Sequence, residues 1–196
     1  MLIDLHCHTL PLSQCSSLKP EELADLARAR GLDAVCLTEH DATWDAAELA
    51  ALNRRTGFLF LPGIELTTDR GHVLAYGLRD GSATFASSAA AAKAAQADGA
   101  LLYLAHPARD GLLRITDDTA TLFASIEVQN GSDTALQNLS ATGLANGFRL
   151  PGIGGSDAHT PAEVGRAATH FETAVTDVAS LLAALCAGQY EAVDLR

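Results

Sequence analysis

Short apolar runs recur along this chain, and most of them end in a small cluster of polar residues before a longer amphipathic segment begins. Short apolar runs predict buried strands, whereas longer segments that open with proline or acidic residues predict helices. The pattern predicts helices over residues 19–30, 45–54, 85–97, 133–146 and 176–187, and strands over residues 1–5, 33–37, 58–61, 72–76, 100–104, 125–128, 150–153, 167–172 and 190–195.

Strands that alternate with helices predict an α/β protein with parallel strands. Polar clusters follow several of the predicted strands at their C-terminal ends, whereas an open doubly wound sheet concentrates its ligands at one crevice. A barrel instead gathers residues from many strand ends at one face. We therefore expect a TIM-barrel-like α/β fold, with residues 1–196 forming one domain.

Composition and charge narrow the class of protein. The chain is 48% hydrophobic and 19% charged, as globular proteins are, and it has neither a membrane-length apolar segment nor a leader-like start. We expect a cytoplasmic protein with four free cysteines and no membrane partner. A net charge of −11 argues against an extensive nucleic-acid surface. It leaves phosphorylated substrates open, because bound cations would reverse the local field.

Six of the seven histidines lie in the polar clusters at strand ends. His6 and His8 are two residues apart, so both point to the same side of a strand, and Asp157 and His159 repeat that spacing. Neutral imidazole together with carboxylate is a donor set that suits zinc, manganese or iron. His170 lies inside a predicted strand and is expected to be structural. The clusters read DLHCHT, LTEHD, GIELT, GHVLAYG, LAHP, IEVQNG and GSDAH.

These motifs, in this order, resemble those of the PHP family, which is named for polymerase and histidinol phosphatase. The resemblance spans residues 4–159. It implies a distorted seven-stranded β/α barrel that holds two or three divalent metal ions, Mn, Zn or Fe, at the C-terminal ends of its strands. It also implies phosphoester hydrolysis as the activity.

The resemblance further implies which side chains bind the metals. The ligands expected for the first ion are His6, His8, Glu65 and Asp157. Glu65 would bridge to a second ion, and the ligands expected to complete that ion's site are His72 and His106.

A third metal site is where this sequence departs from the family pattern. The family would use His40, His159 and an Asp or His shortly after the first motif, but this chain has Ser13-Gln14-Cys15 there. Two metals are therefore expected, and the third stays open. Asp4 and Ser156 are expected to orient metal ligands through hydrogen bonds.

The expected chemistry assigns further roles. Two nearby cations can polarise a phosphoryl oxygen and convert a shared water into hydroxide. His40, His159 and Asp41 are candidates to steady a phosphate oxygen or to protonate the leaving group. Arg109 and Arg70 are candidates to bind the substrate phosphate, because guanidinium presents a fork of donors to it.

The sequence thus predicts a metal-dependent phosphoesterase that hydrolyses a small phosphomonoester or a nucleotide phosphoester. One alternative is a 3′- or 5′-end oligonucleotide exonuclease or phosphodiesterase, and another is a metal-bound binding module without activity. C–N hydrolysis would call for a metal-bridging lysine, and neither Lys19 nor Lys93 follows a predicted strand. Residues 109–118 could form a short loop over the site. Monomer and homodimer both remain open.

Overall fold

Two five-stranded sheets and six helices form the described part of the chain, which comprises residues 1–79, 85, 87–109 and 118–196 of the computed structural model. The strands are β1 (Leu2–Cys7), β2 (Ala34–Leu37), β3 (Leu59–Pro62), β4 (Ile64–Thr68), β5 (Gly71–Tyr76), β6 (Leu101–Leu104), β7 (Ser125–Asn130), β8 (Ile153–Gly155), β9 (Ala167–Phe171) and β10 (Tyr190–Asp194). The helices are α1 (Pro20–Ala29), α2 (Ala46–Thr56), α3 (Ser88–Asp98), α4 (Thr119–Leu122), α5 (Ala135–Ala145) and α6 (Val178–Ala187).

Both sheets are mixed. The first has the order β10-β9-β1-β2-β3 and the second the order β4-β5-β6-β7-β8. β1, β2 and β3 are parallel, as are β6, β7 and β8, but β4, β5 and β6 run antiparallel, and so do β1, β9 and β10. The prediction of an α/β fold is confirmed, whereas the prediction of parallel strands throughout is wrong.

The two sheets approach each other without forming a closed barrel. On one side only Gly63 separates β3 from β4, and a single bridge joins His40 to Glu65. On the other side a single bridge joins Cys7, at the end of β1, to Ala158, just after β8. No ladder between described residues joins β8 to β1, so the predicted seven-stranded barrel is not confirmed.

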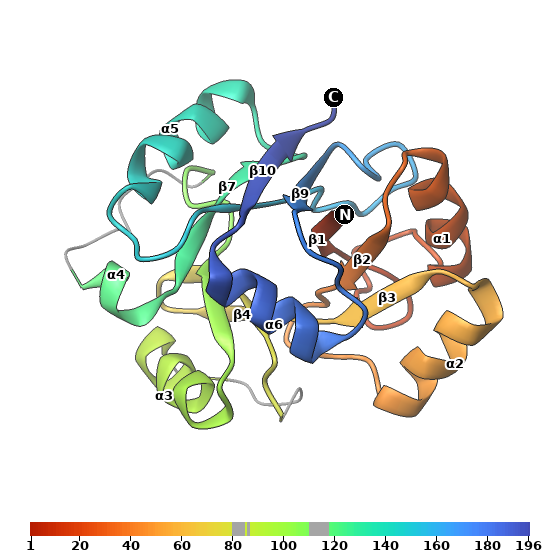
Figure 1. Cartoon of the computed structure of the whole chain (residues 1–196), viewed down its shortest axis with the longest axis horizontal. Coiled ribbons are helices and arrows are strands. Elements are labelled where there is room, and N and C mark those ends of the chain that lie inside the picture. The colour runs from red at the N-terminus through yellow and green to blue at the C-terminus, as the bar shows by residue number, and fades with distance from the viewer. Residues whose placement is uncertain (80–84, 86, 110–117) are drawn as a thin grey trace.

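Helices surround the strands, as Figure 1 shows, with α1 and α2 on one side, α3, α4 and α5 on the other, and α6 crossing in front. The main core lies between the sheets and α6, where Leu181 and Leu185 pack with Ile3, Leu5 and Tyr76. Burying an aliphatic side chain of this size stabilises the fold by about 1.5–3 kcal/mol. The apolar core thus fills one end of the space between the sheets, and the polar clusters occupy the other.

Helix boundaries follow local signals that the sequence carries. Asp45 caps α2 by accepting hydrogen bonds from the backbone of Ala47 and Glu48, and Gly57 ends the helix in the left-handed conformation, with φ of 63°. Thr134 and Gln137 form a capping box at the start of α5. In the described part of the chain, no helix combines the length and apolar character needed to cross a bilayer.

Two predicted boundaries differ in a way that affects the site. β4 is absent from the predicted elements, because Glu65 interrupts its apolar run and the stretch looked like a polar cluster after β3. The structure places Glu65 inside a strand that forms a hairpin with β5. His6 likewise lies within β1 rather than after it. In both cases polar or charged neighbours from distant segments surround the side chain, so it can sit within a buried strand.

Candidate metal centre

Six imidazole rings meet at the C-terminal ends of β1, β2, β6 and β8 and the start of β5. His8 packs against two other rings, with ring centroids 4.3 Å from those of His40 and His159. The remaining histidine, His170, is half exposed and faces Glu191 at 4.0 Å. The six rings that converge are His6, His8, His40, His72, His106 and His159.

His6, His8 and Asp157 form one compact group of potential ligands. The Nε2 atoms of the two histidines are 3.1 Å apart, and Asp157 Oδ1 lies 3.4 Å from the first and 3.3 Å from the second. Burial alone would lower the pKa of His6, but Asp157, Glu127 and Glu65 raise it well above its usual value. These carboxylates would stabilise a cation at this point whether it is a proton or a metal ion.

Glu65 lies between imidazoles from four segments of the chain. Its Oε2 is 3.2 Å from His8 Nε2 and 2.9 Å from His40 Nδ1, while its Oε1 is 2.9 Å from His72 Nδ1 and 3.1 Å from His106 Nε2. Burial would raise the pKa of Glu65, yet the surrounding imidazoles hold it well below its usual range. The ionised carboxylate is thus placed to bridge two groups of ligands.

The donor set fits divalent cations. Glu65 Oε2 is buried and accepts no hydrogen bond, although two imidazole nitrogens approach it. A buried carboxylate oxygen without a donor is costly unless a cation satisfies it. Among the described residues, three sets of ligand atoms each lie within 4.8 Å of one another: His6, His8 and Asp157; His40, Glu65 and His72; and His8, His40 and His159.

The third of these sets bears on the expected third metal site, for which Ser13-Gln14-Cys15 offers no Asp or His. The ring that joins His40 and His159 is His8. Gln14 and Cys15 are exposed, and the Gln14 amide donates to Pro11 O. Of the three residues, only Ser13 turns inward, where its Oγ lies 3.3 Å from His8 Nδ1.

Glu127 contacts the cluster through His6 and is not among the predicted site residues. Its Oε1 lies 3.0 Å from His6 Nδ1, and its Oε2 accepts hydrogen bonds from the backbone of His106 at 2.8 Å and from the Asn130 amide at 2.9 Å. An imidazole that donates through Nδ1 presents the lone pair of Nε2 to the cluster. The position of Glu127 in the strand-end motif IEVQNG was the available signal.

Asp4 and Ser156 lie where they can hold β1 against β8. Asp4 Oδ1 accepts from the backbone of Ser156 at 2.8 Å and of His6 at 3.1 Å. Burial raises the pKa of Asp4 to about 6, and the hydrogen bonds with Ser156 only partly oppose this. A Cβ at Gly155 would lie 2.5 Å from the backbone nitrogen of His6, so glycine permits this close approach.

Three residues of the predicted site have a positive φ, in the left-handed region that residues other than glycine rarely adopt: Asp41 (φ 49°), His106 (φ 26°) and Asp157 (φ 52°). Such strain concentrates at functional sites. Asp41 also ties its turn to β4, because its Oδ1 accepts from Thr67 N at 2.7 Å and its own N–H donates to Glu65 O at 2.9 Å.

The two predicted phosphate-binding arginines both have carboxylate partners. Arg109 Nη2 lies 2.7 Å from Asp157 Oδ2, and its Nε donates to Asp133 at 2.7 Å. Arg70 donates to Asp118 at 2.8 Å. A phosphate would therefore compete with carboxylates at both arginines, and Arg109 also contacts a predicted metal ligand. Residues 110–117 of the predicted loop over the site lie outside the described residues.

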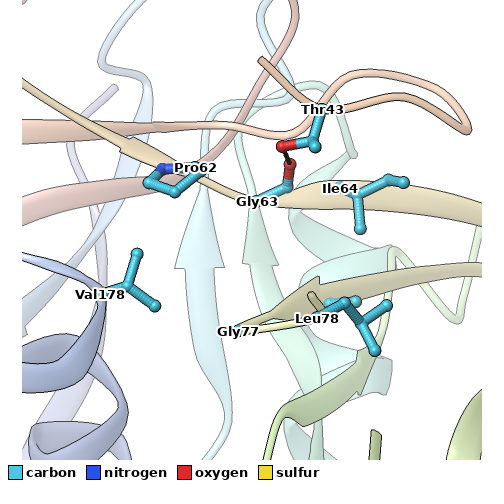
Figure 2. A pocket seen from close by; sticks show the side chains of 8 residues that line it. Thr43, Pro62, Gly63, Ile64, Gly77, Leu78 and Val178 are labelled. Atoms are coloured by element: carbon cyan, nitrogen blue, oxygen red, sulfur yellow. Dashed lines mark hydrogen bonds between the residues drawn. The ribbon is translucent and has the colours of Figure 1, made fainter. Parts of the chain in front are cut away.

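A separate cavity of about 160 Å³ lies beside the Gly63 turn (Figure 2). Its lining includes Pro62, Ile64, Leu78 and Val178, and the Thr43 hydroxyl donates to Gly63 O there. None of its lining residues is titratable. This cavity therefore lacks the titratable groups that the histidine cluster offers.

Comparisons with solved structures agree with the observed fold. PsfC from Pseudomonas syringae superposes with a TM-score of 0.74 at 21% identity, covering 98% of this chain and 91% of that one. A Bifidobacterium adolescentis protein named as a metal-dependent phosphoesterase gives 0.65 at 18% identity, covering 95% and 96%. A Chromobacterium violaceum amidohydrolase, solved with sulfate and without metal, gives 0.66 at 21% identity, covering 99% and 98%.

Sequence comparisons identify the family. A 3′,5′-nucleoside bisphosphate phosphatase from Chromobacterium violaceum is 38% identical over 80 residues, which are 39% of this chain and 27% of that protein. The match thus spans about a quarter of that relative's length. The PHP-associated family matches residues 135–190, and the PHP domain matches residues 4–143. Because the latter match takes in more than half of the chain and most of the converging histidines, this chain belongs to the PHP domain family.

Proposed function

We propose that this protein is a metal-dependent phosphoesterase that acts on a small phosphomonoester or a nucleotide phosphoester. The observation that carries the proposal is the position of Glu65, whose unpartnered oxygen lies between His8 and His40 while its other oxygen meets His72 and His106. A carboxylate shared by two sets of imidazoles suits a two-metal site. The names of the bisphosphate phosphatase relative and of the phosphoesterase with the same fold support the same chemistry.

The ligands proposed for two divalent ions, Mn, Zn or Fe, are His6, His8, Glu65, Asp157, His72 and His106. His40 and His159 would serve a third ion or the reacting groups. Bound ions would supply Lewis acidity toward a phosphoryl oxygen and would acidify water near neutral pH.

The surrounding residues suggest how catalytic roles divide. Burial, followed by the neighbouring His8, lowers the pKa of His159, so its ring is neutral near pH 7 and suits a ligand or a base better than an acid. Its Nδ1 lies 3.0 Å from Asp157 O and donates to it, which leaves Nε2 available. His40 is then the better candidate to protonate a leaving group. Arg109, one-third exposed beside Asp157, is the proposed phosphate contact.

C–N hydrolysis through a metal-bridging lysine receives no support from the positions of the lysines. Lys19 is exposed just before α1, and Lys93 is exposed on α3. The same site chemistry also serves end-directed phosphodiesterases, so monoester and diester substrates must be compared directly.

The experiment combines metal analysis with a substrate panel. Protein purified without added metal is analysed for bound elements, then assayed with manganese on p-nitrophenyl phosphate, its bis ester and a set of mononucleotides. The Glu65→Gln variant should lose metal and at least about 100-fold in kcat/KM, because it removes the bridging charge. Glu48→Gln, an exposed glutamate on α2, is the matched control and should behave as wild type.

Less than about one ion per chain in wild-type protein would overturn the proposal. Bound metal with no turnover on any of the three substrate types would favour the binding module instead. Turnover that survives in Glu65→Gln would contradict the bridging role of that residue.

A further inference from the structure

A buried carboxylate outside the predicted ligand set lies next to the cluster. Glu39 is fully buried, and it forms no ion pair with an Arg or Lys among the described residues. Its oxygens accept four hydrogen bonds: from Thr9 N at 2.9 Å, from Thr9 Oγ1 at 2.5 Å, from Ser13 Oγ at 2.5 Å and from Trp44 Nε1 at 3.0 Å. The Thr9 N–H and the Trp44 indole N–H can only donate, and each meets a different oxygen of Glu39, so the side chain must act as an acceptor at both oxygens. An ionised carboxylate meets that requirement, and an amide would not.

Ser13 connects this carboxylate to a proposed metal ligand. Its Oγ donates to Glu39 Oε2 at 2.5 Å. His8 Nδ1 and the backbone nitrogen of His40 each lie 3.3 Å from Ser13 Oγ. A hydroxyl has one proton to donate. Because the short contact with Glu39 uses that proton, Ser13 can only accept from the other two groups. His8 must therefore carry its proton on Nδ1.

The opposite nitrogen of neutral His8 is then the one whose lone pair would bind a metal ion, and it faces the cluster. His8 Nε2 lies 3.2 Å from Glu65 Oε2, 3.3 Å from Asp157 Oδ1 and 3.1 Å from His6 Nε2. Metal-binding histidines usually donate their other ring N–H to a carboxylate or a carbonyl. Here a serine hydroxyl stands between the imidazole and the carboxylate.

We propose that Glu39 and Ser13 form a hydrogen-bond relay that fixes the tautomer and ring orientation of His8 for metal binding. Both are positioning residues. The proposal rests on the proposed metal centre, and it gives Ser13 a role in a stretch where the family pattern would place a third-site ligand. The relay also links the backbone of His40 to the same hydroxyl, so it orders two segments of the cluster at once.

Zinc affinity of the full chain, measured by competition with a chromophoric chelator, tests the relay. Ser13→Ala should weaken zinc binding by about 10–100-fold, whereas Ser13→Thr keeps the hydroxyl and should stay within about threefold of wild type. Ser125→Ala is the matched control, because Ser125 Oγ is also buried but has no hydrogen-bond partner. Glu39→Gln, alone and combined with Ser13→Ala, completes a double-mutant cycle. The double variant should lose no more affinity than Ser13→Ala alone.

A second readout reports the tautomer directly. Nitrogen-15 NMR of the imidazoles, recorded on metal-free protein at a pH where His8 is neutral, should show His8 protonated on Nδ1 in wild type and Ser13→Thr. In Glu39→Gln the amide NH2 group can donate to Ser13 Oγ, so the Ser13 hydroxyl can donate to His8 Nδ1 instead. The proton of neutral His8 should then move toward Nε2.

Unchanged zinc affinity in Ser13→Ala, or a wild-type His8 protonated on Nε2, overturns the relay. Additive losses in the double variant also overturn it, since they indicate two independent packing effects. Wild-type protein that binds no zinc or other divalent metal would instead defeat the proposed function. The NMR tautomer would still decide the relay in that case.

Discussion

Arg109 and Asp157 form an ion pair at the edge of the cluster, with Nη2 2.7 Å from Oδ2. The other carboxylate oxygen of Asp157 faces His6 and His8 at 3.4 and 3.3 Å. Burial would raise the pKa of Asp157, yet these two histidines and Arg109 together hold it far below its usual value. Asp157 thus presents one oxygen to the proposed metal site and the other to an arginine that fixes the carboxylate plane.

Replacing Arg109 by lysine should weaken both metal binding and catalysis. Lysine cannot contact Asp157, Asp133 and Asn130 as one fork, so we expect about 10-fold weaker zinc binding and a 10–100-fold lower kcat/KM. Chelator competition and steady-state kinetics measure the two effects. Arg54→Lys, on the exposed face of α2, should change neither. A raised KM with unchanged zinc affinity would show that Arg109 serves the substrate alone.

Asp4→Asn should stabilise the metal-free protein at high pH and not at low pH. The pKa of Asp4 rises from 3.8 to about 6 on folding, mainly through burial. Below pH 3.8 the folded and unfolded states both hold the proton of Asp4. Above about pH 6 the folded state bears a buried charge that costs up to about 3 kcal/mol. Thermal unfolding at about pH 4 and pH 8 measures the difference. An equal gain at both pH values would contradict this explanation, and Asp25→Asn, exposed on α1, should show none.

Metal removal should reverse the pH dependence of stability. Burial would lower the pKa of His6 and His8, but nearby carboxylates, including Asp157 and Glu65, outweigh this and raise it. In metal-free protein this stabilisation is present below the ordinary value of 6.5 and is lost as pH rises through the folded-state pKa. Bound metal requires neutral rings, so its affinity should rise with pH. Thermal unfolding with and without EDTA should therefore show opposite trends between about pH 6 and pH 9. Parallel trends would contradict metal binding by these rings.

The Asp41→Asn variant tests whether Asp41 holds its turn in place or donates a proton in the reaction. The Asp41 carboxylate accepts from the backbone of Thr67, and asparagine keeps both that acceptor and a tolerance for the left-handed backbone. We expect kcat/KM within about threefold of wild type for Asp41→Asn and a large loss for Asp41→Val, because a β-branched residue is strained at this φ. If Asp41→Asn loses activity as severely as Asp41→Val, the carboxylate takes part in the reaction.

Gly155→Ala should separate β8 from β1 and displace His6. The new Cβ would lie 2.4 Å from His6 Cβ, so the strands must shift, at a cost of about 1–3 kcal/mol in the free energy of unfolding. Zinc affinity should fall with it. Gly143→Ala is the matched control, since its Cβ would contact nothing within 4 Å on α5 and should stabilise the helix by about 0.5–1 kcal/mol. Unaltered zinc affinity in Gly155→Ala would show that this contact does not position His6.

The sequence alone determined most of the strands and helices, β4 and α4 excepted, and it singled out the histidines that meet in the cluster. Caps such as Asp45 and Gly57 are local signals, and apolar runs mark strands whatever their partners, so both can be read from the chain. The i, i+2 spacing of His6 and His8 set both rings on one side, and their Nε2 atoms are 3.1 Å apart in the structure. The seven motifs also sufficed to indicate the family.

Tertiary structure decided what depends on partners distant in the chain. The antiparallel hairpin of β4 and β5 escaped prediction, because Glu65 is stable inside a strand only once imidazoles surround it. Glu39 and Glu127 lie in strand-end motifs, but their roles, like that of Ser13, follow from hydrogen bonds between distant residues. Arg109 could be named as a candidate from the sequence, but its contact with Asp157 arises from folding. Local preference selects elements, whereas the position of a charge depends on the neighbours that compensate its burial.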